Sequence, residues 1–484
     1  MTMLAVRVAL LVATLLIAST SLARDALPRA VGRAFLDHGV PLNRVAIIVQ
    51  EIGKSKPIFA YDAERPMNPA SVMKLVTTFA ALEILGRDHR WKTEAYLGGP
   101  ILNRVLKGDL ILKGYGDPKI TIEQWQAFMA ALRMNGLDAI EGDLVLDRSY
   151  FSLPLHDPAS FDGEPLKPYN VGPDALLVNF KSVRLMFAPD VVAGTVSVNA
   201  EPRLDGIVLG PSPALDSSDC GDWRNAVRAN FFTAADRASV AFAGRYALSC
   251  GERDWWIALL DHPHYVHAVF TAAFREAGGR FSGGLKERRA PRDAQPFATL
   301  ESPPLYDIVR DVNKLSNNVM ARQIFLTLAA ATYPPPATPA KAADAVKSWL
   351  KSRKLTIPGL TLENGSGLSR HERITAGGLA RLLLAADASP IRDEFASSLA
   401  VAATDGTVER RFQNGTVAGQ ALLKTGSLEG VRALAGYVID GDGRRFVVVA
   451  IINHKNAAGG AGALDKLVQW VYQNGAAWNP ALQH

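Results

Sequence analysis

The sequence predicts an α/β (α+β) fold in which both ends of the chain contribute to one antiparallel five-stranded sheet that is flanked by helices. Two nested inserted domains are expected to interrupt this sheet-forming part. The prediction rests on strand patterns near both ends of the chain, because the strands at one end alone are too few for a stable sheet. It also rests on size, since 484 residues, 48% of them hydrophobic, suffice for about three domains with cores of their own.

The first 23 residues have the pattern of a secretory signal peptide. Arg7 is followed by an uncharged apolar run over residues 8–18 and by Ser21-Leu22-Ala23, a small-x-small cleavage site. This run is short for a membrane span, and residues 464–472 are too few and too mixed in charge for an amphipathic anchor. We therefore expect a periplasmic protein, cleaved after Ala23, with no integral membrane anchor.

Two segments near the start of the chain and three near its end have the composition and alternation of strands. The first pair turns at Gly53-Lys54-Ser55 and the last pair at Asp440-Gly441-Asp442-Gly443. Because a two-stranded hairpin is marginal in water, the two ends are expected to share one sheet, with a helix over residues 463–472 beside it. The predicted strands are residues 45–51, 57–61, 421–428, 432–439 and 445–452.

Ser71-Val72-Met73-Lys74 lies at the start of a predicted helix. With Asn68 as N-cap and Pro69 at the first helical position, the hydroxyl of Ser71 is not needed for capping. Lys74 follows three residues later, so its amine can lie on the same helix face as that hydroxyl. A serine beside a lysine amine is the arrangement of an activated nucleophile.

Two further motifs follow in order, Ser316-Asn317-Asn318 and Lys424-Thr425-Gly426. Together with Ser71 and Lys74 they form the three-part signature of the serine acylases, which are the penicillin-binding proteins and the serine β-lactamases. The third motif lies in a predicted strand of the shared sheet, which places it beside the helix of Ser71. The joint order and context of the motifs predict covalent chemistry at Ser71.

Two similar motifs are discounted because of their context. Ser348-Trp349-Leu350-Lys351 repeats the first motif inside a predicted surface helix over residues 340–354, where no turn or cap exposes the serine. Ser197-Val198-Asn199 imitates the second motif, but its alternating neighbours predict a strand.

Roughly 240 residues separate Lys74 from Ser316, far more than a single acylase domain needs. The insertion begins with hairpin-like segments, a helix over residues 122–137 and a strand over residues 143–147. Its middle part is rich in alternating segments such as residues 176–187, 195–200 and 239–248, which predict a mostly β domain. The expected domains are a catalytic domain of residues 24–90 and 300–484, an inserted α/β domain of residues 91–168 and 267–299, and a nested mostly β domain of residues 169–266.

The chain resembles the low-molecular-mass class C penicillin-binding proteins, which are D-alanyl-D-alanine carboxypeptidases and endopeptidases of the cell wall. Beyond the three motifs, the resemblance rests on Gly116-Asp117-Pro118, on the segment from Asn364 to Arg370 and on Asp405-Gly406-Thr407. The large insertion between the first two motifs is the most specific sign. The resemblance implies a penicillin-binding/β-lactamase-like transpeptidase fold, with peptidoglycan stem peptides as substrates and β-lactams as acylating inhibitors.

The resemblance also assigns catalytic roles. Ser71 would attack the carbonyl between two D-alanines, with Lys74 as general base. That role needs a lysine that is neutral for part of the time, and burial together with the neighbouring cation of Lys424 would lower its pKa. The backbone N–H groups of Ser71 and Ser427 would hold the oxyanion. Ser316 would relay the proton to the leaving amine.

The remaining roles concern the substrate. Asn318 would bind a substrate amide, and Lys424 with Thr425 would hold the terminal carboxylate. Gly426 has no side chain to obstruct an extended peptide that pairs with the strand edge.

Two more residues are assigned by position in the family's motifs. Asp147, at a strand end, matches the place where the family receives the amino group of a diaminopimelyl stem peptide, although a turn-forming aspartate is an equal alternative. Arg370 resembles the family's substrate-contacting arginine, against the alternative of a solvated loop cation. The chain departs from the pattern at Glu429, where relatives often carry a neutral amide. An extra carboxylate there would repel acidic substituents of a substrate.

Cys220 and Cys250 are the only cysteines, and the family pairs cysteines in the nested domain. The resemblance therefore implies a structural disulfide. Closing a loop of about thirty residues would stabilise the fold by roughly 3.5 kcal/mol on the chain-entropy account.

Metal, cofactor and nucleic-acid functions are not expected. His262, His264 and His267 lie close together in sequence, but His267 belongs to an apolar helix and no cysteine or carboxylate spacing completes a site. A net charge of +6 on a chain of this size gives little reason to invoke nucleic acid and fits an anionic cell-wall polymer equally well. No Gly-x-Ser-x-Gly elbow is present, which disfavours an α/β-hydrolase triad.

Two alternatives to the D,D-peptidase remain. A β-lactamase would use the same chemistry with fast deacylation, but its compact domain needs no long insertion. A non-catalytic peptidoglycan-binding scaffold would tolerate the loss of Ser71, whereas the chain keeps all the expected catalytic side chains. The sequence leaves a homodimer open.

Overall fold

The computed structural model describes residues 27–413 and 415–478, so the predicted signal peptide lies outside the described residues. Contacts divide the chain into two compact units. Unit 1 comprises Met1–Arg87, Val309–Asn317 and Val346–His484, and unit 2 comprises Asp88–Ile308 and Asn318–Ala345. Within the described ranges, no helix is both long and apolar enough to cross a membrane.

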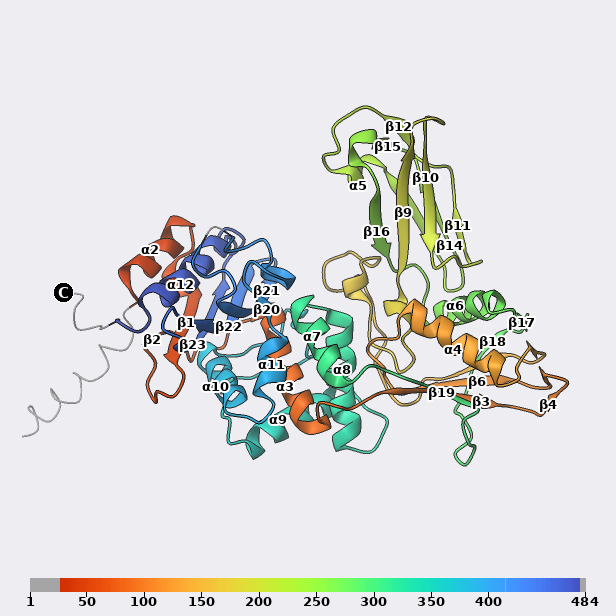
Figure 1. Cartoon of the computed structure of the whole chain (residues 1–484), viewed down its shortest axis with the longest axis horizontal. Coiled ribbons are helices and arrows are strands. Elements are labelled where there is room, and N and C mark those ends of the chain that lie inside the picture. Colours follow the sequence, from red (N-terminus) through yellow and green to blue (C-terminus); the bar gives the residue numbers. More distant parts are fainter. Residues whose placement is uncertain (1–26, 414, 479–484) are drawn as a thin grey trace, which may run out of the picture. The chain divides into compact units, whose positions relative to one another are not determined.

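Unit 1 is built on one antiparallel sheet to which both ends of the chain contribute (Figure 1). All five predicted strands are present, and the pairing of β1 with β23 joins the two ends. A sixth strand, β20, extends the sheet beside β21, and at two residues it is too short to show alternation in the sequence. The order is β2 (Phe59–Tyr61), β1 (Val45–Glu51), β23 (Arg445–Asn453), β22 (Val431–Ile439), β21 (Ala421–Leu428) and β20 (Ala400–Val401).

Helices cover both faces of this sheet, which is why its central strands are apolar on both sides. On one face α2 (Arg29–Asp37) and α12 (Ala461–Asn474) form a core with the inward side chains of β1, β22 and β23. On the other face α10 (Ala376–Asp387) packs against β22, where the hydroxyl of Tyr437 donates to the carbonyl of Leu383 at 2.7 Å. The predicted C-terminal helix is thus confirmed and extends slightly beyond residues 463–472.

Unit 2 contains an α/β region with two mixed sheets. The larger has the order β18 (Leu285–Glu287), β8 (Leu144–Asp147), β6 (Leu110–Gly114), β3 (Lys92–Leu97) and β19 (Ala298–Glu301). The smaller has the order β17 (Arg280–Phe281), β7 (Ala139–Ile140), β5 (Val105–Leu106) and β4 (Ile101–Leu102). The helices of this region are α4 (Ile122–Met134) and α6 (His262–Glu276). A capping box of Thr121 and Gln124 starts α4, which stops at Met134, just before Asn135 and Gly136.

The middle of unit 2 is mostly β, with a short helix α5 (Trp223–Ala226). Its first strand starts later than predicted, because Asn179, Phe180 and Lys181 adopt positive φ in a 3₁₀ turn before β9. The strands are β9 (Val183–Asp190), β10 (Thr195–Glu201), β11 (Ile207–Leu209), β12 (Ala214–Asp216), β13 (Ala229–Thr233), β14 (Ala238–Phe242), β15 (Arg245–Ala247) and β16 (Arg253–Ile257).

Unit 2 also includes α8 (Asn318–Thr332), whereas α7 (Leu305–Lys314) and α9 (Pro339–Ser352) each run from one unit into the other. Ser348, in the discounted repeat of the first motif, lies on α9. The finer division of unit 2 into an α/β domain of residues 91–168 and 267–299 and a nested domain of residues 169–266 stays a prediction.

The predicted disulfide between Cys220 and Cys250 is present. Its two loops also share a hydrogen bond in which the hydroxyl of Ser249 donates to the carbonyl of Ser218 at 2.9 Å. The disulfide closes a loop over a sequence separation of 30 residues. It therefore lowers the conformational entropy of the unfolded chain. This helps to stabilise the mostly β region, whose sheets have only two or three strands.

Replacing both cysteines by alanine should lower the free energy of unfolding by about 3 kcal/mol, because the unfolded chain regains the entropy of the open loop. Denaturant titration under non-reducing conditions measures this. Ser249→Ala is the matched control, since it breaks only the hydrogen bond between the same loops and should cost about 1 kcal/mol or less. A loss as small for the double variant as for the control would contradict the prediction.

Candidate active site

Ser71 lies in a 3₁₀ turn, η2 (Ala70–Met73), that leads into α3 (Lys74–Leu85). The prediction of an α-helix capped by Asn68 is therefore wrong in geometry. Ala70 has φ 48°, which an α-helix does not allow, and Asn68 Oδ1 accepts the Ala70 N–H at 2.9 Å. A non-glycine residue with positive φ is strained, so the turn that holds Ser71 needs support from its surroundings.

Asn68 and Asn453 provide part of that support. The N–H of Asn68 donates to Asn453 Oδ1 and its carbonyl accepts from Asn453 Nδ2, both at 2.9 Å. Asn68 Nδ2 also donates to the carbonyl of Ser369 at 2.8 Å. Asn68, two residues before the nucleophile turn, is thereby bound to the end of β23 and to the loop of residues 363–372.

The first amine–hydroxyl pair is that of Lys74 and Ser71. Lys74 Nζ lies 2.9 Å from Ser71 Oγ and donates to the carbonyl of Ser366 at 2.5 Å. The lysine side chain is 0% exposed. An amine within hydrogen-bond distance of a half-buried hydroxyl meets the geometric requirement for taking its proton.

The second pair is that of Lys424 and Ser316. Lys424 Nζ lies 2.8 Å from Ser316 Oγ and donates to the carbonyl of Thr425 at 2.9 Å. Ser316 has φ 58°, a second strained backbone position in the site. Burial lowers the pKa of Lys424 to about 7, because the charged amine has lost its water.

Two glycines allow the elements of unit 1 to close around the nucleophile turn. A Cβ at Gly426 would lie 2.5 Å from the carbonyl oxygen of Pro69 and 3.1 Å from the N of Ser71. A Cβ at Gly367 would lie 1.9 Å from the carbonyl oxygen of Ala70. Gly426 therefore lets β21 approach the serine, a reason that the sequence did not indicate. Its role toward an extended peptide stays a prediction.

The segment Asp405-Gly406-Thr407 connects the second motif with the third. Asp405 Oδ2 pairs with Lys314 Nζ at 2.5 Å, two residues before Ser316. The hydroxyls of Thr407 and Thr425 hydrogen-bond at 2.7 Å. One short segment thus holds the end of α7 and the strand that carries Lys424.

Ser427, Arg370 and Glu429 lie around the end of β21. Ser427 is exposed on the strand. Arg370 donates to the carbonyl of Glu429 at 3.1 Å and pairs with its carboxylate at 3.5 Å. The Glu429 side chain is 91% exposed. The carboxylate of Glu429, where relatives often carry a neutral amide, therefore lies beside Arg370, the predicted substrate-contacting arginine.

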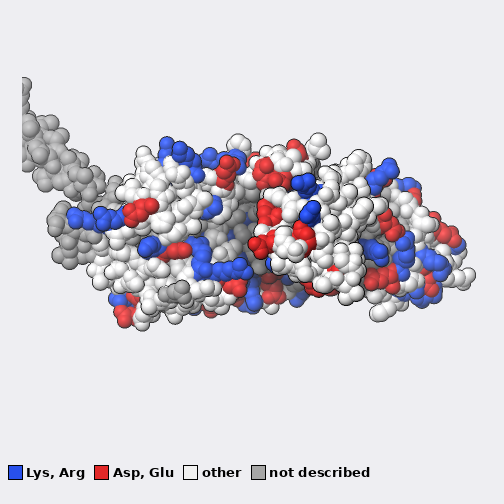
Figure 2. All heavy atoms as spheres, turned by 90° about the horizontal axis from the view of Figure 1, so that it is seen from above, with Lys and Arg blue, Asp and Glu red and all other residues white. Residues whose placement is uncertain are grey.

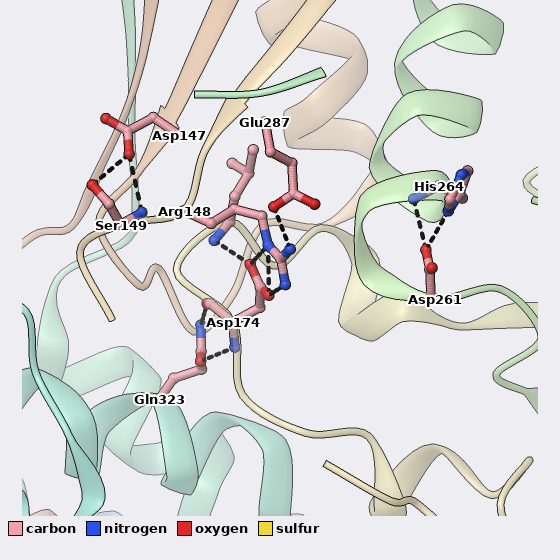
Figure 3. Close-up of polar contacts among 9 residues, drawn as sticks. Asp147, Arg148, Ser149, Asp174, Asp261, His264, Glu287 and Gln323 are labelled. Atoms are coloured by element: carbon pink, nitrogen blue, oxygen red, sulfur yellow. Dashed lines mark hydrogen bonds and ion pairs between the residues drawn. The ribbon is translucent and has the colours of Figure 1, made fainter. Parts of the chain in front are cut away.

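Asp147 and Asn318 belong to unit 2. Asp147 ends β8 and is buried; its Oδ1 accepts from the N–H of Ser149 at 3.0 Å and from the hydroxyl at 2.7 Å (Figure 3). Its Oδ2 accepts from the N–H of Ala290 at 2.9 Å. These bonds are those of a turn-forming aspartate, and its substrate role stays a prediction. Asp147 also lines a cavity of about 370 Å³, together with Leu146, Arg148, Ser149, Phe151, Leu153, Asp174, Ala175, Glu287, Arg288 and Arg289.

Beside this cavity, Arg148 points toward Asp174 and Glu287 and forms an ion pair with each (Figure 3). The backbone of Asp174 is bound in turn by Gln323 of α8, whose side chain accepts its N–H at 2.9 Å and donates to its carbonyl at 2.7 Å. Asn318 is the first residue of the same helix. Within unit 2, the loop of Asp174 therefore fixes the helix that starts with the last residue of the second motif.

Among the described residues, the histidines belong to no metal site. His264 Nδ1 bonds to Asp261 at 2.7 Å at the start of α6, and Figure 3 shows this pair apart from the Asp147 turn. Over the described ranges, no group of three or more His, Cys, Asp or Glu side chains could hold a metal ion. On the face drawn in Figure 2, basic and acidic side chains occur beside one another rather than in one basic stripe.

Three residues that the structure brings to the site were not predicted: Asn453, Lys314 and Ser366. Ser366 lies in the segment from Asn364 to Arg370, on which the resemblance rests, and Lys314 lies two residues before Ser316. Their positions close to motifs could have indicated both residues. Asn453 had none, because its partner Asn68 is 385 residues away in the chain.

Comparison with known proteins places this site in a family. The sequence profile described as the "D-Ala-D-Ala carboxypeptidase 3 (S13) family" matches residues 28–474. The chain is 26% identical over 414 residues to "D-alanyl-D-alanine carboxypeptidase DacB" of Haemophilus influenzae, covering 85% of each chain. It is 34% identical over 429 residues to "Carboxypeptidase DacB" of Mycolicibacterium smegmatis, covering 84% of this chain and 75% of that protein.

The fold is similar to that of penicillin binding protein 4 (dacB) from Haemophilus influenzae, a crystal structure with 25% sequence identity. The TM-score is 0.76, and the match covers 93% of this chain and 99% of the other. The match confirms the expected mixed α/β fold of the penicillin-binding/β-lactamase-like kind.

Lys424→Met should stabilise the folded protein while removing the amine from the site. The pKa of Lys424 is about 7 when folded, against an ordinary value of 10.5. Between these pH values the unfolded chain binds a proton that the folded protein lacks, so the stability of the wild type rises with pH there. The free energy of unfolding of the variant should therefore exceed that of the wild type most at pH 7 and below, by an amount on the order of a few kcal/mol. The difference should vanish toward pH 10.5.

Denaturant titrations at several pH values measure this difference. Lys347→Met, which replaces an exposed lysine of α9, is the control and should show no such pH dependence. A gain for Lys424→Met that stays constant from pH 7 to pH 10 would contradict the prediction.

Proposed function

Because the chain belongs to the D-Ala-D-Ala carboxypeptidase 3 (S13) family, we propose that Ser71 is the nucleophile with which it hydrolyses D-alanyl-D-alanine and crosslink peptide bonds of peptidoglycan. The chain is a serine-type D-Ala-D-Ala carboxypeptidase. The observation that carries the assignment of residues is the pair of contacts in unit 1, Lys74 Nζ to Ser71 Oγ at 2.9 Å and Lys424 Nζ to Ser316 Oγ at 2.8 Å. The endopeptidase activity belongs to the same proposal.

In the acylation step, the neutral amine of Lys74 takes the proton of Ser71 Oγ as the oxygen attacks the carbonyl carbon. The backbone N–H groups of Ser71 and Ser427 bind the oxyanion that forms. At Gly426, β21 approaches the turn of Ser71 closely, which supports the assignment of these two N–H groups to one oxyanion site. Donors that are fixed before the reaction do not have to reorganise during it, which lowers the barrier.

When the tetrahedral intermediate collapses, the C–N bond breaks and the leaving amine needs a proton. Ser316 relays to that nitrogen the proton that Lys74 took from Ser71, so the amine leaves neutral and Lys74 is again free of the added proton. Asn318 binds a substrate amide. Water then attacks the acyl carbon, with Lys74 again as base, and releases Ser71.

Lys424 and Thr425 hold the carboxylate of the terminal D-alanine. A bound carboxylate favours the charged amine and so raises the lysine pKa. Since burial lowers the pKa of Lys424 to about 7 without substrate, its charge forms most readily when substrate is present. This coupling favours peptides that end in a free carboxylate.

Asp147 and Arg370 are proposed to contact the rest of the stem peptide, Asp147 through an amino group and Arg370 through an acidic group. The cavity beside Asp147 supports the first assignment. The exposure of Arg370 beside the strand end supports the second.

We further infer that the protein is exported, with a signal peptide cleaved after Ala23, and acts on the cell wall in the periplasm. The peptidase family and the apolar run over residues 8–18 support this location. The findings give no support for a homodimer, and none is proposed.

Acylation by benzylpenicillin tests the function. Mature wild-type protein should gain the mass of one intact penicillin within minutes and keep it over hours, because a β-lactam mimics the dipeptide and deacylates slowly. Ser71→Ala should gain no mass. Intact-protein mass spectrometry measures both.

Two other outcomes would decide against the proposal. Rapid loss of the adduct with turnover of the drug would favour a β-lactamase. The absence of any adduct on the folded wild type would contradict the acylase mechanism and favour a non-catalytic scaffold.

Glu429→Gln should raise kcat/KM for stem peptides with an acidic side chain by up to about fivefold. The exposed ion pair with Arg370 is worth at most about 1 kcal/mol, so removing the charge of Glu429 has a limited effect. Activity assays with an acidic stem peptide and its amidated counterpart measure the ratio. Asp37→Asn, which removes the same charge from α2, should leave the ratio unchanged, and an equal change for both substrates would contradict the prediction.

A further inference from the structure

Glu372, at the end of the loop of residues 363–372, has a buried carboxylate to which no role has been assigned. The carboxylate turns back to the start of the same loop. It is 0% exposed. Its Oε1 accepts three backbone N–H groups, from Glu363 and Asn364 at 3.0 Å and from Gly365 at 2.9 Å. Its Oε2 has no hydrogen-bond partner among the described residues. A buried acidic group with one oxygen unsatisfied costs free energy, so its retention calls for a compensating role.

The three N–H groups belong to the residues that lead directly into the contact with Lys74. The carbonyl of Gly365 accepts from Thr77 Oγ1 on α3 at 2.6 Å, and the carbonyl of Ser366 accepts from Lys74 Nζ at 2.5 Å. The next residue, Gly367, packs against the backbone of Ala70 and Ser71. Three consecutive residues of this loop therefore touch the helix and turn that carry the first motif.

The shape of this loop depends on hydrogen bonds, because two of its residues are glycines. Gly365 and Gly367 both have positive φ, at 69° and 79°, and glycines lose much conformational freedom when they are ordered. The Asn364 side chain accepts from the N–H and hydroxyl of Ser366 at 2.9 Å and 2.7 Å. Glu372 is the group that gathers the N–H groups at the start of the loop, so the direction of the Ser366 carbonyl depends on it.

We propose that Glu372 is a positioning residue for Lys74. By binding the N–H groups of residues 363–365, its carboxylate sets the Ser366 carbonyl, which aims the lysine amine at Ser71 Oγ. This proposal rests on the function proposed above for Ser71 and Lys74. It assigns to Glu372 an effect on the rate of the covalent step rather than on substrate binding.

Benzylpenicillin acylation resolved into a dissociation constant and an acylation rate constant tests the proposal. Glu372→Gln keeps the shape and one acceptor oxygen but loses the charge, so it should lower the rate constant about tenfold. Glu372→Ala leaves the three N–H groups unpaired and should lower it further, by about 100-fold. The dissociation constant should change less than about twofold in both variants.

Asp440→Asn is the matched control, measured with thermal unfolding of every variant. Asp440 is also a buried carboxylate of unit 1 that accepts two loop N–H groups, those of Asp442 at 3.0 Å and Arg444 at 2.8 Å, but its turn joins β22 to β23. It should lower the unfolding midpoint and leave the rate constant unchanged.

The outcomes separate the two proposals. If wild type forms no adduct, the function proposed for Ser71 fails. If wild type is acylated but folded Glu372→Gln is acylated at the same rate, or loses only affinity, the positioning role of Glu372 is wrong. If Asp440→Asn slows acylation as much as Glu372→Gln does, the effect reflects loss of loop stability in general and the proposal is equally overturned. Since Glu372→Gln is isosteric, it decides the question even where the alanine variant does not fold.

Discussion

The burial of two lysine amines in one unit is the constraint on which the rest of the site depends. Lys74 and Lys424 are both 0% exposed, and burying a charged amine away from water is costly. Each amine therefore lies within hydrogen-bond distance of a serine hydroxyl and a backbone carbonyl. Several features bring backbone close enough for these contacts: the glycines at positions 367 and 426, the strained residues Ala70 and Ser316, and the hydrogen-bonded amides of Asn68 and Asn453.

The sequence allowed the covalent chemistry and most of the sheet to be predicted. The three motifs are local and ordered, and the strands of residues 45–51 and 421–428 have the bounds that their alternation indicated. The errors arose where local patterns carry little information. A two-residue strand shows no period, positive φ at Asn179–Lys181 interrupts an apolar run, and Ala70 gives no sign of its conformation. Tertiary contacts decide these features.

The supporting residues of the site were harder to predict for a related reason. Asn453 and Glu372 act on backbone groups rather than on recognisable side chains. A backbone acceptor such as the Ser366 carbonyl can belong to any type of residue, so the sequence does not reveal it. Glu372 lies close to the segment from Asn364 to Arg370, but in the sequence it looks like any charged loop residue until its burial is known.

The pairing of β1 with β23 has a consequence for biosynthesis. A chain synthesised from its N-terminus presents β1 and the turn of Ser71 long before β21, β22 and β23 exist. The catalytic sheet therefore closes only when synthesis is almost complete, and pairings between such distant segments form slowly. Until then the apolar strand β1 can pair only with β2, and its other edge is open to aggregation. The order in which its strands are made thus keeps the enzyme inactive until its last strands are available.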